Sequence, residues 1–323
     1  MTRQGGLCAV VLAAGEGKRM RTQRAKVLHE AGGSTLIDHV LAALEPLAPS
    51  PVVVVVGHLR AQVEAHLAGH GVALAVQDPP RGTGDALARA LSRLPGEGDV
   101  LVLSGDVPLI TSATLGALVE LRHSRNAAAV LVTAQLTDPG TYGRIVRNPV
   151  GDVAGIVEAR DATLEQRAIR EVNAGTYVFD LAVLRGAINR LRPDNAQGEY
   201  YLTDVVGILV ADGLRVAGLR LEDPAEMAGV NSRADLAEVH RLLNGRVVRR
   251  LQEAGVTVLD PATTWVDADC TVGPDTVLEA GVHLRRGCVV GAGCRIGAHS
   301  VLEGVSLANG SIVPPLTRRN DAE

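Results

Sequence analysis

The sequence predicts a doubly wound α/β domain, followed by a long connecting helix and a short parallel β-helix. Three observations lead to this prediction. Apolar runs alternate with amphipathic stretches through residues 7–134. Apolar residues then recur at helical spacing from Leu236 to Leu251. From Val266 onward, an aliphatic residue returns at every sixth position. A chain of 323 residues has room for two such domains.

The first domain begins with four apolar runs that we predict to be buried parallel strands, at residues 8–13, 52–56, 72–76 and 100–103. Amphipathic stretches between and after them predict helices, near 36–44, 60–67, 83–94 and 112–122. Strands and helices that alternate in this way form an α/β sheet whose ligands bind at the carboxyl ends of the strands. We therefore expect the functional site at that edge.

Residues 140–230 have a more mixed pattern. Residues 153–157 and 172–179 are predicted strands, and 201–210 is a predicted helix. The helical spacing from Leu236 to Leu251 ends at Gly255 and predicts an arm between two domains.

The last part of the chain is a hexapeptide repeat, which is typical of a parallel β-helix. Its aliphatic positions are Val266, Val272, Leu278, Leu284, Val290, Ile296 and Leu302. A small residue follows each of them after four positions, at Cys270, Thr276, Val282, Cys288, Cys294, Ser300 and Ser306. Three of these are cysteines that could be proposed as zinc ligands, but their place in the repeat predicts inward packing instead. Cys8 lies in the first strand and is predicted to be core.

We expect this repeat to stop near Leu302. The predicted domains are residues 1–230 for the α/β domain, 231–255 for the arm helix, 256–313 for the β-helix and 314–323 for a disordered tail.

Composition excludes several classes of protein. The net charge of −4 gives no general attraction to nucleic acid. The apolar run 52–56 is far shorter than the ~20 residues of a membrane helix. The apolar segment 7–14 leads into a polar loop rather than a cleavage site, so we expect a cytoplasmic protein. Four cysteines are too few for a secreted disulfide scaffold.

The loop after the first predicted strand, Gly15-Glu16-Gly17-Lys18-Arg19, is a candidate phosphate site. Glycines there let backbone N–H groups approach phosphates closely. A Walker A loop would need Ser or Thr after Lys18, and a dinucleotide loop would need a third glycine. Among 32 basic residues, only Lys18 and Lys26 are lysines, and both lie in this region. A compact ammonium suits a phosphate contact, although chance placement also explains two rare residues.

The motifs that follow are specific in their order along the chain. They are Leu12–Met20, Ala25-Lys26-Val27-Leu28-His29, Gln77 with Gly82-Thr83-Gly84, Gly105-Asp106-Val107-Pro108-Leu109, Tyr142–Val146, Ile156-Val157-Glu158, Asp161-Ala162-Thr163, Glu171–Gly175, Asn195–Asp204 and Gly229-Val230-Asn231. Together with the hexapeptides, this order resembles the uridylyltransferase part of the bifunctional N-acetylglucosamine-1-phosphate uridylyltransferase/glucosamine-1-phosphate acetyltransferase family. The resemblance covers about residues 7–312 and implies a Rossmann-like nucleotidyltransferase domain with a left-handed β-helix.

The resemblance also implies a reaction. UTP and N-acetylglucosamine 1-phosphate would give pyrophosphate and UDP-N-acetylglucosamine, a peptidoglycan precursor. Acetyl transfer in this family uses β-helix coils beyond those expected here, so we expect no acetyltransferase activity. The family's full β-helix forms trimers, which makes a homo-oligomer a possible state of this chain.

Site residues are implied on the same basis. The uracil and ribose would contact Leu12, Ala13, Ala14, Gly15, Gln77, Gly82 and Thr83. Arg19 and Lys26 would act in catalysis by neutralising the triphosphate, and Ser104 and Gly105 would also line the substrate site. Gly143, Glu158 and Asn173 would contact the amino sugar. Asp106 and Asn231 would hold Mg²⁺, with Asn231 also at the substrate.

Several alternatives remain open at this point. Asp106 before Pro108 also suits a turn, and Asn231 also suits a helix N-cap. The chain could be a pyrophosphorylase for another base or sugar, or a paralogue that only binds a UDP-sugar. Departures from the family pattern leave rate and specificity open; they are Lys18 for a usual Thr, Ala25 for a usual Pro, and Arg81, Asp85 and Ser104.

Overall fold

The computed structural model describes residues 6–321, which form two compact units. The first unit holds the chain up to His29 together with Leu36–Ser232. The second holds Glu30–Thr35 together with the chain from Arg233 onward. Each unit has its own hydrophobic core.

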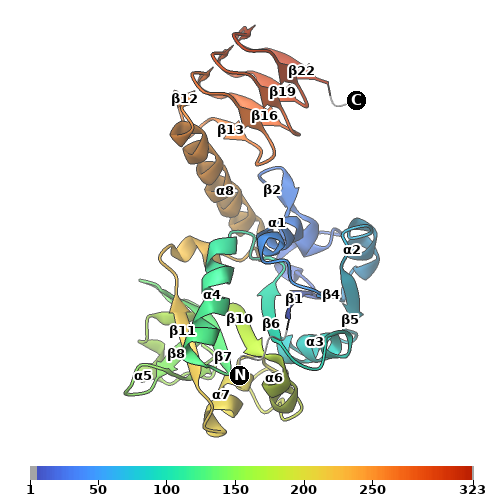
Figure 1. The fold of residues 1–323 in the computed structure, drawn as a ribbon, viewed down its shortest axis with the longest axis vertical. Coiled ribbons are helices and arrows are strands. Elements are labelled where there is room, and N and C mark those ends of the chain that lie inside the picture. The colour runs from blue at the N-terminus through green and yellow to red at the C-terminus, as the bar shows by residue number, and fades with distance from the viewer. Residues whose placement is uncertain (1–5, 322–323) are drawn as a thin grey trace. The chain divides into compact units, whose positions relative to one another are not determined.

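The first unit is built on a nine-stranded mixed sheet (Figure 1). Its strands are β1 (Leu7–Ala13), β4 (Val52–Val56), β5 (Ala73–Val76), β6 (Asp99–Ser104), β7 (Ala129–Gln135), β8 (Arg144–Arg147), β9 (Val153–Val157), β10 (Glu171–Asp180) and β11 (Val216–Arg220). The main order is β11-β7-β10-β6-β1-β4-β5, and β8 joins β10 to β9. Strands β6, β1, β4 and β5 are parallel, as predicted, whereas β10 runs antiparallel to β6, β7 and β8.

Helices cover this sheet. They are α1 (Leu36–Leu44), α2 (Arg60–His66), α3 (Thr83–Ala90), α4 (Ser112–Arg125), α5 (Leu164–Arg167), α6 (Leu181–Ile188) and α7 (Asp204–Ala211). Short 3₁₀ helices lie at Lys18–Met20, Lys26–Leu28, Glu45–Leu47, Leu91–Arg93 and Pro224–Met227. None of the helices in the described residues 6–321 is long and apolar enough to cross a membrane.

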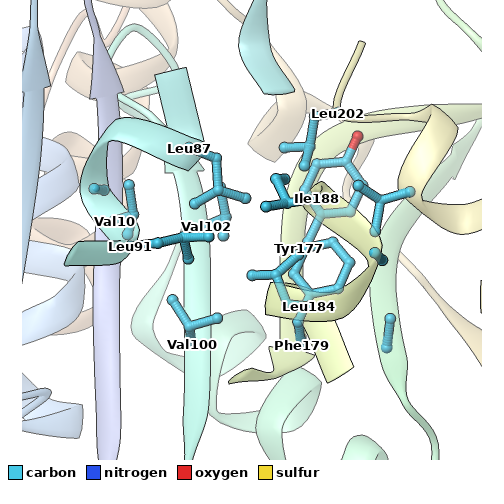
Figure 2. Packing of buried hydrophobic residues seen from close by; sticks show 14 of the residues in the cluster. Val10, Leu87, Leu91, Val100, Val102, Tyr177, Phe179, Leu184, Ile188 and Leu202 are labelled. Atoms are coloured by element: carbon cyan, nitrogen blue, oxygen red, sulfur yellow. The ribbon is translucent and has the colours of Figure 1, made fainter. Parts of the chain in front are cut away.

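The central strands are continuous apolar runs because both of their faces are buried. Val100 and Val102 of β6 belong to one core cluster, and Leu101 and Leu103 belong to the other. Figure 2 shows the first cluster, in which Leu87 of α3 and Ile188 of α6 lie over the sheet residues. Packing on both faces of the sheet fixes the positions of the strand ends, which form the edge where we expect the functional site.

The second unit combines a hairpin, a long helix and a β-helix. The hairpin is β2 (Glu30–Ala31) and β3 (Ser34–Thr35), and the helix is α8 (Arg233–Glu253). The β-helix strands are β12 (Thr257–Val258), β13 (Trp265–Val266), β14 (Thr271–Val272), β15 (Val277–Leu278), β16 (His283–Arg285), β17 (Val289–Val290), β18 (Arg295–Ile296), β19 (Val301–Glu303), β20 (Ser306–Leu307), β21 (Ile312–Val313) and β22 (Arg318–Asn320). They stack in three parallel sheets, β12-β15-β18-β21, β13-β16-β19-β22 and β14-β17-β20. The hairpin was not predicted from the sequence.

Buried contacts hold the parts of the second unit together. Asn244 of α8 donates to the Thr264 carbonyl at 2.8 Å and accepts from the Val266 N–H at 2.9 Å. The three cysteines of the repeat are buried free thiols, in agreement with their predicted packing role. Cys8 is likewise a buried free thiol in β1.

The repeat differs from the sequence expectation near its end. Successive coils are 18 residues apart at Val289, which pairs with Thr271, but 17 apart at Ser306, which pairs with Val289. One residue fewer at this corner places Val305 inside and leaves Ser306 exposed, so the inward assignment of Ser306 was wrong.

The chain also continues to stack beyond Leu302. Strand β21 pairs with β18, and β22 pairs with β19 at Arg318–Asn320. This stretch lies within residues 314–323, where we expected a disordered tail, and it is structured up to Asp321. The Pro314 carbonyl accepts from the Ser300 hydroxyl at 3.0 Å, and Pro314 lies in the corner between β21 and β22.

Candidate active site

A cavity of about 460 Å³ opens at the carboxyl ends of the parallel strands. Leu12 and Ala13 end β1, and Ser104 ends β6 beside them. Among the residues that we expected at the nucleotide, it is lined by Leu12, Ala13, Ala14, Gly15, Gln77, Gly82, Thr83, Ser104, Lys26 and Asp106. Gly105 supports the same edge, since its N–H donates to the Leu12 carbonyl at 2.9 Å.

The side-chain amide of Gln77 has a defined orientation in this cavity. Gln77 is only 5% exposed, and its amide nitrogen donates to the Gly82 carbonyl and to Asp85 Oδ2, both at 2.9 Å. Both partners are acceptors, so the nitrogen has to face them. The carbonyl oxygen of Gln77 is therefore left to accept a hydrogen bond from a ligand.

The segment Gly82-Thr83-Gly84 packs against the later motif at Tyr200. Gly82 has φ +101°, and a Cβ there would lie 2.6 Å from the Tyr200 carbonyl oxygen. Thr83 accepts from the Leu202 N–H at 3.1 Å. Only glycine permits this approach at Gly82, so the two motifs form one wall of the cavity.

Lys26, Asp106 and Asn231 meet at the edge of this cavity. The Lys26 ammonium forms an ion pair with Asp106 and donates to Asn231 Oδ1 at 3.3 Å. The backbone brings Asp106 and Asn231 together, because the Val230 N–H donates to the Asp106 carbonyl at 2.9 Å. The side chains of Lys26 and Asp106 are 13% and 16% exposed, so this charge contact is mostly shielded from water.

The pair Asp106 and Asn231 fits the expected Mg²⁺ ion. A carboxylate oxygen and an amide oxygen both face one cation, the ammonium of Lys26. Magnesium prefers such hard oxygen ligands and takes few of them from the protein when phosphates supply the rest. The donor set is therefore suitable for this metal.

The loop before Lys26 is held by Gln62 of α2. Gln62 accepts from the Ala25 N–H at 2.9 Å and donates to the Gln23 carbonyl at 2.8 Å. A proline at position 25 would have no N–H for this bond. With Ala in place of the usual Pro, the backbone N–H at position 25 is available for this contact, which helps to fix the loop.

A second cavity of about 270 Å³ adjoins the first. The two share Ser104 and Asp106, and the second also contains Gly143, Glu158, Asn173 and Asn231. It brings together the residues that we expected at the amino sugar with the expected metal ligands. A Cβ on Gly143 would lie 2.9 Å from Ile156, so this wall is closely packed.

Glu158 and Asn173 are tied to the protein in different ways. Glu158 Oε1 accepts from the Thr203 hydroxyl at 3.0 Å, and burial raises the pKa of its carboxyl group. The Asn173 amide donates to the Tyr177 hydroxyl at 2.6 Å and accepts from the Gly175 N–H at 3.1 Å. These bonds hold the irregular stretch of β10, where its register with β7 shifts, so Asn173 also has a structural role.

Arg19 does not line the cavity that contains the expected nucleotide residues. It is exposed and lines a third cavity of about 710 Å³, together with Arg144, Arg160, Arg167 and Glu158. Lys18 lines the first cavity with an exposed side chain that pairs with Glu16 at 2.5 Å. The structure thus groups Lys26, and not Arg19, with Asp106.

Two supporting residues were missed as site residues, for the same reason. In the sequence, Asp85 stands out only as a departure from the family pattern, and Gln62 does not stand out at all. Asp85 accepts a hydrogen bond from Gln77, and Gln62 accepts one from Ala25. Only folding brings these pairs together. The unusual charge at Asp85 was the one signal available in the sequence.

Comparison with known proteins shows the family to which the chain belongs. Residues 9–173 match the family model of the MobA-like NTP transferase domain, and residues 269–304 match six bacterial transferase hexapeptide repeats. The chain is 46% identical over 312 residues to the bifunctional protein GlmU of Thermobifida fusca, covering 94% of this chain and 64% of that protein. It is 46% identical over 321 residues to the bifunctional protein GlmU of Mycobacterium tuberculosis, covering 97% and 65%. The chain therefore spans slightly less than two thirds of the length of these relatives.

Solved structures share the fold over about three quarters of this chain at low sequence identity. A candidate glucose-1-phosphate thymidylyltransferase from Bacillus anthracis, in complex with sucrose, has a TM-score of 0.58 at 19% identity and covers 73% of this chain and 95% of its own. A nucleotidyl transferase from Methanothermobacter thermautotroptrophicus has a TM-score of 0.51 at 20% identity, covering 74% and 97%. Fold, family match and site agree with the predicted nucleotidyltransferase: the chain belongs to the family of MobA-like NTP transferase domains.

Proposed function

We propose that this chain transfers the uridylyl group of UTP to N-acetylglucosamine 1-phosphate and releases pyrophosphate. The observation that carries the proposal is the pair of adjoining cavities that share Ser104 and Asp106. A nucleotide in the first and a sugar phosphate in the second would bring their phosphates together beside Asp106. The similarity to proteins named bifunctional protein GlmU supports this choice of substrates.

The reaction requires positioning and charge neutralisation more than proton transfer. An oxygen of the sugar phosphate is already a nucleophile and forms a bond to the α-phosphorus of UTP. The bond from that phosphorus to the oxygen bridging to the β-phosphate breaks, and pyrophosphate leaves with the electron pair. The chain lowers the barrier by holding two anions close together and by balancing their charge.

Lys26, Asp106 and Asn231 would carry the electrostatic part. Asp106 and Asn231 would hold Mg²⁺, which supplies positive charge to the phosphates when bound. Lys26 contributes a compact positive charge at the same place, and its loop is fixed by Gln62. The role first assigned to Arg19 stays a prediction, since Arg19 lines a different cavity.

Gln77 would select the base. Its carbonyl oxygen is left to accept a hydrogen bond, and N3 of uracil carries a hydrogen. Cytosine has an acceptor at N3, which would face the Gln77 oxygen without a hydrogen between them. The orientation of one amide therefore favours UTP over CTP.

A pyrophosphate-release assay tests the proposed reaction. The purified chain is supplied with Mg²⁺, each common nucleoside triphosphate, and either N-acetylglucosamine 1-phosphate or glucose 1-phosphate. We expect release only when triphosphate and sugar phosphate are both present, and the highest kcat/KM for UTP with N-acetylglucosamine 1-phosphate. A higher kcat/KM for another pair would identify that pair as the preferred substrates. The absence of pyrophosphate release with every pair would contradict the proposal that the chain is an enzyme.

Asp106→Asn provides the matched test of the site. It keeps the shape of the side chain and removes its charge, so we expect turnover to fall on the order of 10²-fold or more. Asp269→Asn makes the same change at an exposed position of the second unit and should leave turnover unchanged. Equal turnover in both variants would remove Asp106 from the mechanism.

The absence of acetyltransferase activity in this chain of 323 residues stays a prediction. Its test is to supply acetyl-CoA and glucosamine 1-phosphate and to follow free thiol. Sustained enzyme-dependent thiol release, with N-acetylglucosamine 1-phosphate formed, would contradict it.

A further inference from the structure

Two histidines and an aspartate meet on the first unit, among residues with no part in the proposed reaction. Asp38 lies in the first turn of α1, His66 is the last residue of α2, and His70 follows in the next turn. Each offers one ligand atom, and these atoms all lie within 4.8 Å of one another. None of the three lines the cavities of the candidate active site.

Local structure explains why they converge. The Leu67 N–H closes α2 on the Val63 carbonyl, and the His70 N–H then donates to the Leu67 carbonyl at 3.0 Å. This tight turn keeps His66 and His70 close, with ring centroids 5.5 Å apart. Asp38 reaches them from a separate helix.

The distances suit a tetrahedral metal site. Metal–ligand bonds of roughly 2.0–2.2 Å place neighbouring ligand atoms of a tetrahedron about 3.3–3.6 Å apart. The Asp38 Oδ1 atom lies 2.9 Å from His66 Nε2 and 3.6 Å from His70 Nε2. The first of these distances differs from the tetrahedral value by a few tenths of an ångström and the second falls at its upper end, while all the ligand atoms lie within 4.8 Å of one another. The side chains are 27% to 39% exposed, so water can reach a fourth corner.

We propose that Asp38, His66 and His70 form a binding site for Zn²⁺ or a similar transition-metal ion, separate from the magnesium ligands. The chemistry of the donors distinguishes the two sites. Two imidazole nitrogens with one carboxylate suit zinc, whereas magnesium prefers an all-oxygen set such as Asp106 with Asn231. The bound ion would join α1 to α2, the helix whose Gln62 holds the loop before Lys26.

A simpler alternative is an Asp–His hydrogen bond with a second histidine nearby. His70→Ala separates the two cases, because it leaves the contact between Asp38 and His66 intact and removes only the third ligand. His58→Ala is the matched control, since His58 is an exposed histidine outside the cluster.

The experiment uses the full chain in excess Mg²⁺. Zn²⁺ binding is measured by titration calorimetry, and Co²⁺ replaces it to report tetrahedral geometry through its visible absorption. We expect one ion per chain, a Co²⁺ spectrum of tetrahedral type and a higher Tm with zinc. His70→Ala should weaken binding at least tenfold, and His66→Ala should abolish it, whereas His58→Ala should bind like the unmodified chain.

Two results would overturn the proposal. One is the absence of saturable one-to-one zinc binding by the unmodified chain. The other is equal zinc affinity in His70→Ala and the unmodified chain, which would place the ion elsewhere. Neither measurement depends on catalysis, so the outcome is independent of the proposed function. His70→Ala retains the test if His66→Ala fails to fold.

Discussion

The contact between Gln77 and Asp85 makes a quantitative prediction about base selection. In the unmodified chain, turning the Gln77 amide to accept CTP would break its bonds to the Gly82 carbonyl and to Asp85. A neutral hydrogen bond contributes about 1 kcal/mol, and one to a charged group about 2 kcal/mol. The amide therefore resists rotation by about 3 kcal/mol, which corresponds to roughly a 150-fold preference for UTP over CTP.

Asp85→Ala removes the charged acceptor and leaves only the Gly82 bond. The resistance falls to about 1 kcal/mol, or roughly a fivefold preference, so the ratio of kcat/KM for UTP to that for CTP should drop about 30-fold. The assay is pyrophosphate release at low triphosphate concentration, with saturating sugar phosphate.

Two controls separate this effect from a general loss of the site. Asp85→Asn keeps an acceptor oxygen but loses its charge, so the resistance should fall only to about 2 kcal/mol and the preference to roughly 30-fold. Arg89→Ala removes the residue that pairs with Asp85 at 3.3 Å but leaves Gln77 untouched, so the preference should not change. An Asp85→Ala enzyme with the original UTP-to-CTP ratio would refute the reasoning.

Three further predictions concern charge, the catalytic loop and pH. Lys26→Arg keeps the charge but not the compact shape, so steady-state assays should give at least about a tenfold lower kcat/KM, and full activity would show that an ammonium is not required. Ala25→Pro should destabilise the unmodified chain, because it removes the N–H group that donates to Gln62, but should stabilise a Gln62→Ala chain by about 0.4–1 kcal/mol. Chemical denaturation measures both changes in the free energy of unfolding, and changes of the same sign would argue against the loop contact. Burial raises the pKa of Glu158 above its ordinary value of 4.5, so the folded chain keeps this proton to a higher pH than the unfolded chain. The contribution of the protonated carboxyl group to stability is therefore lost as the pH rises from about 4.5 through the raised pKa. The stability of Glu158→Gln relative to the unmodified chain should therefore rise across that window in denaturation curves, and a difference independent of pH would contradict the assignment.

Much of the sheet was predictable because burial on both faces leaves a mark in the sequence. The strand at Val52–Val56 and the helix at Leu36–Leu44 have the predicted bounds, since each is a clear apolar run or stripe. The hexapeptide spacing similarly predicted the β-helix. The direction of β10 was not predictable, because strand direction depends on pairing with segments far along the chain.

Some features of the candidate site were likewise predictable from the sequence, and others were not. The residues at strand ends and in the motifs came from the sequence, and most of them line the two adjoining cavities. The orientation of the Gln77 amide and the support from Gln62 did not, since both depend on hydrogen-bond partners that only folding brings near. The predicted inward position of Ser306 was wrong for another reason. One residue missing from a coil changes which side chains face inward, and a regular repeat gives no sign of it.

The hairpin Glu30–Thr35 has a consequence for how the protein is made. It belongs to the second unit, yet the chain of that unit resumes only at Arg233, about 200 residues later. At a synthesis rate of roughly 5–20 residues per second, the ribosome would expose the hairpin for about 10–40 s before its partner helix emerges. Residues 36–232 of the first unit are synthesised in that interval, so much of its sheet can form before the hairpin has a partner. In a fragment ending at Ser232, the hairpin would never meet its partner helix. The Gly32 carbonyl would also lack its 3.1 Å hydrogen bond from the Ala268 N–H.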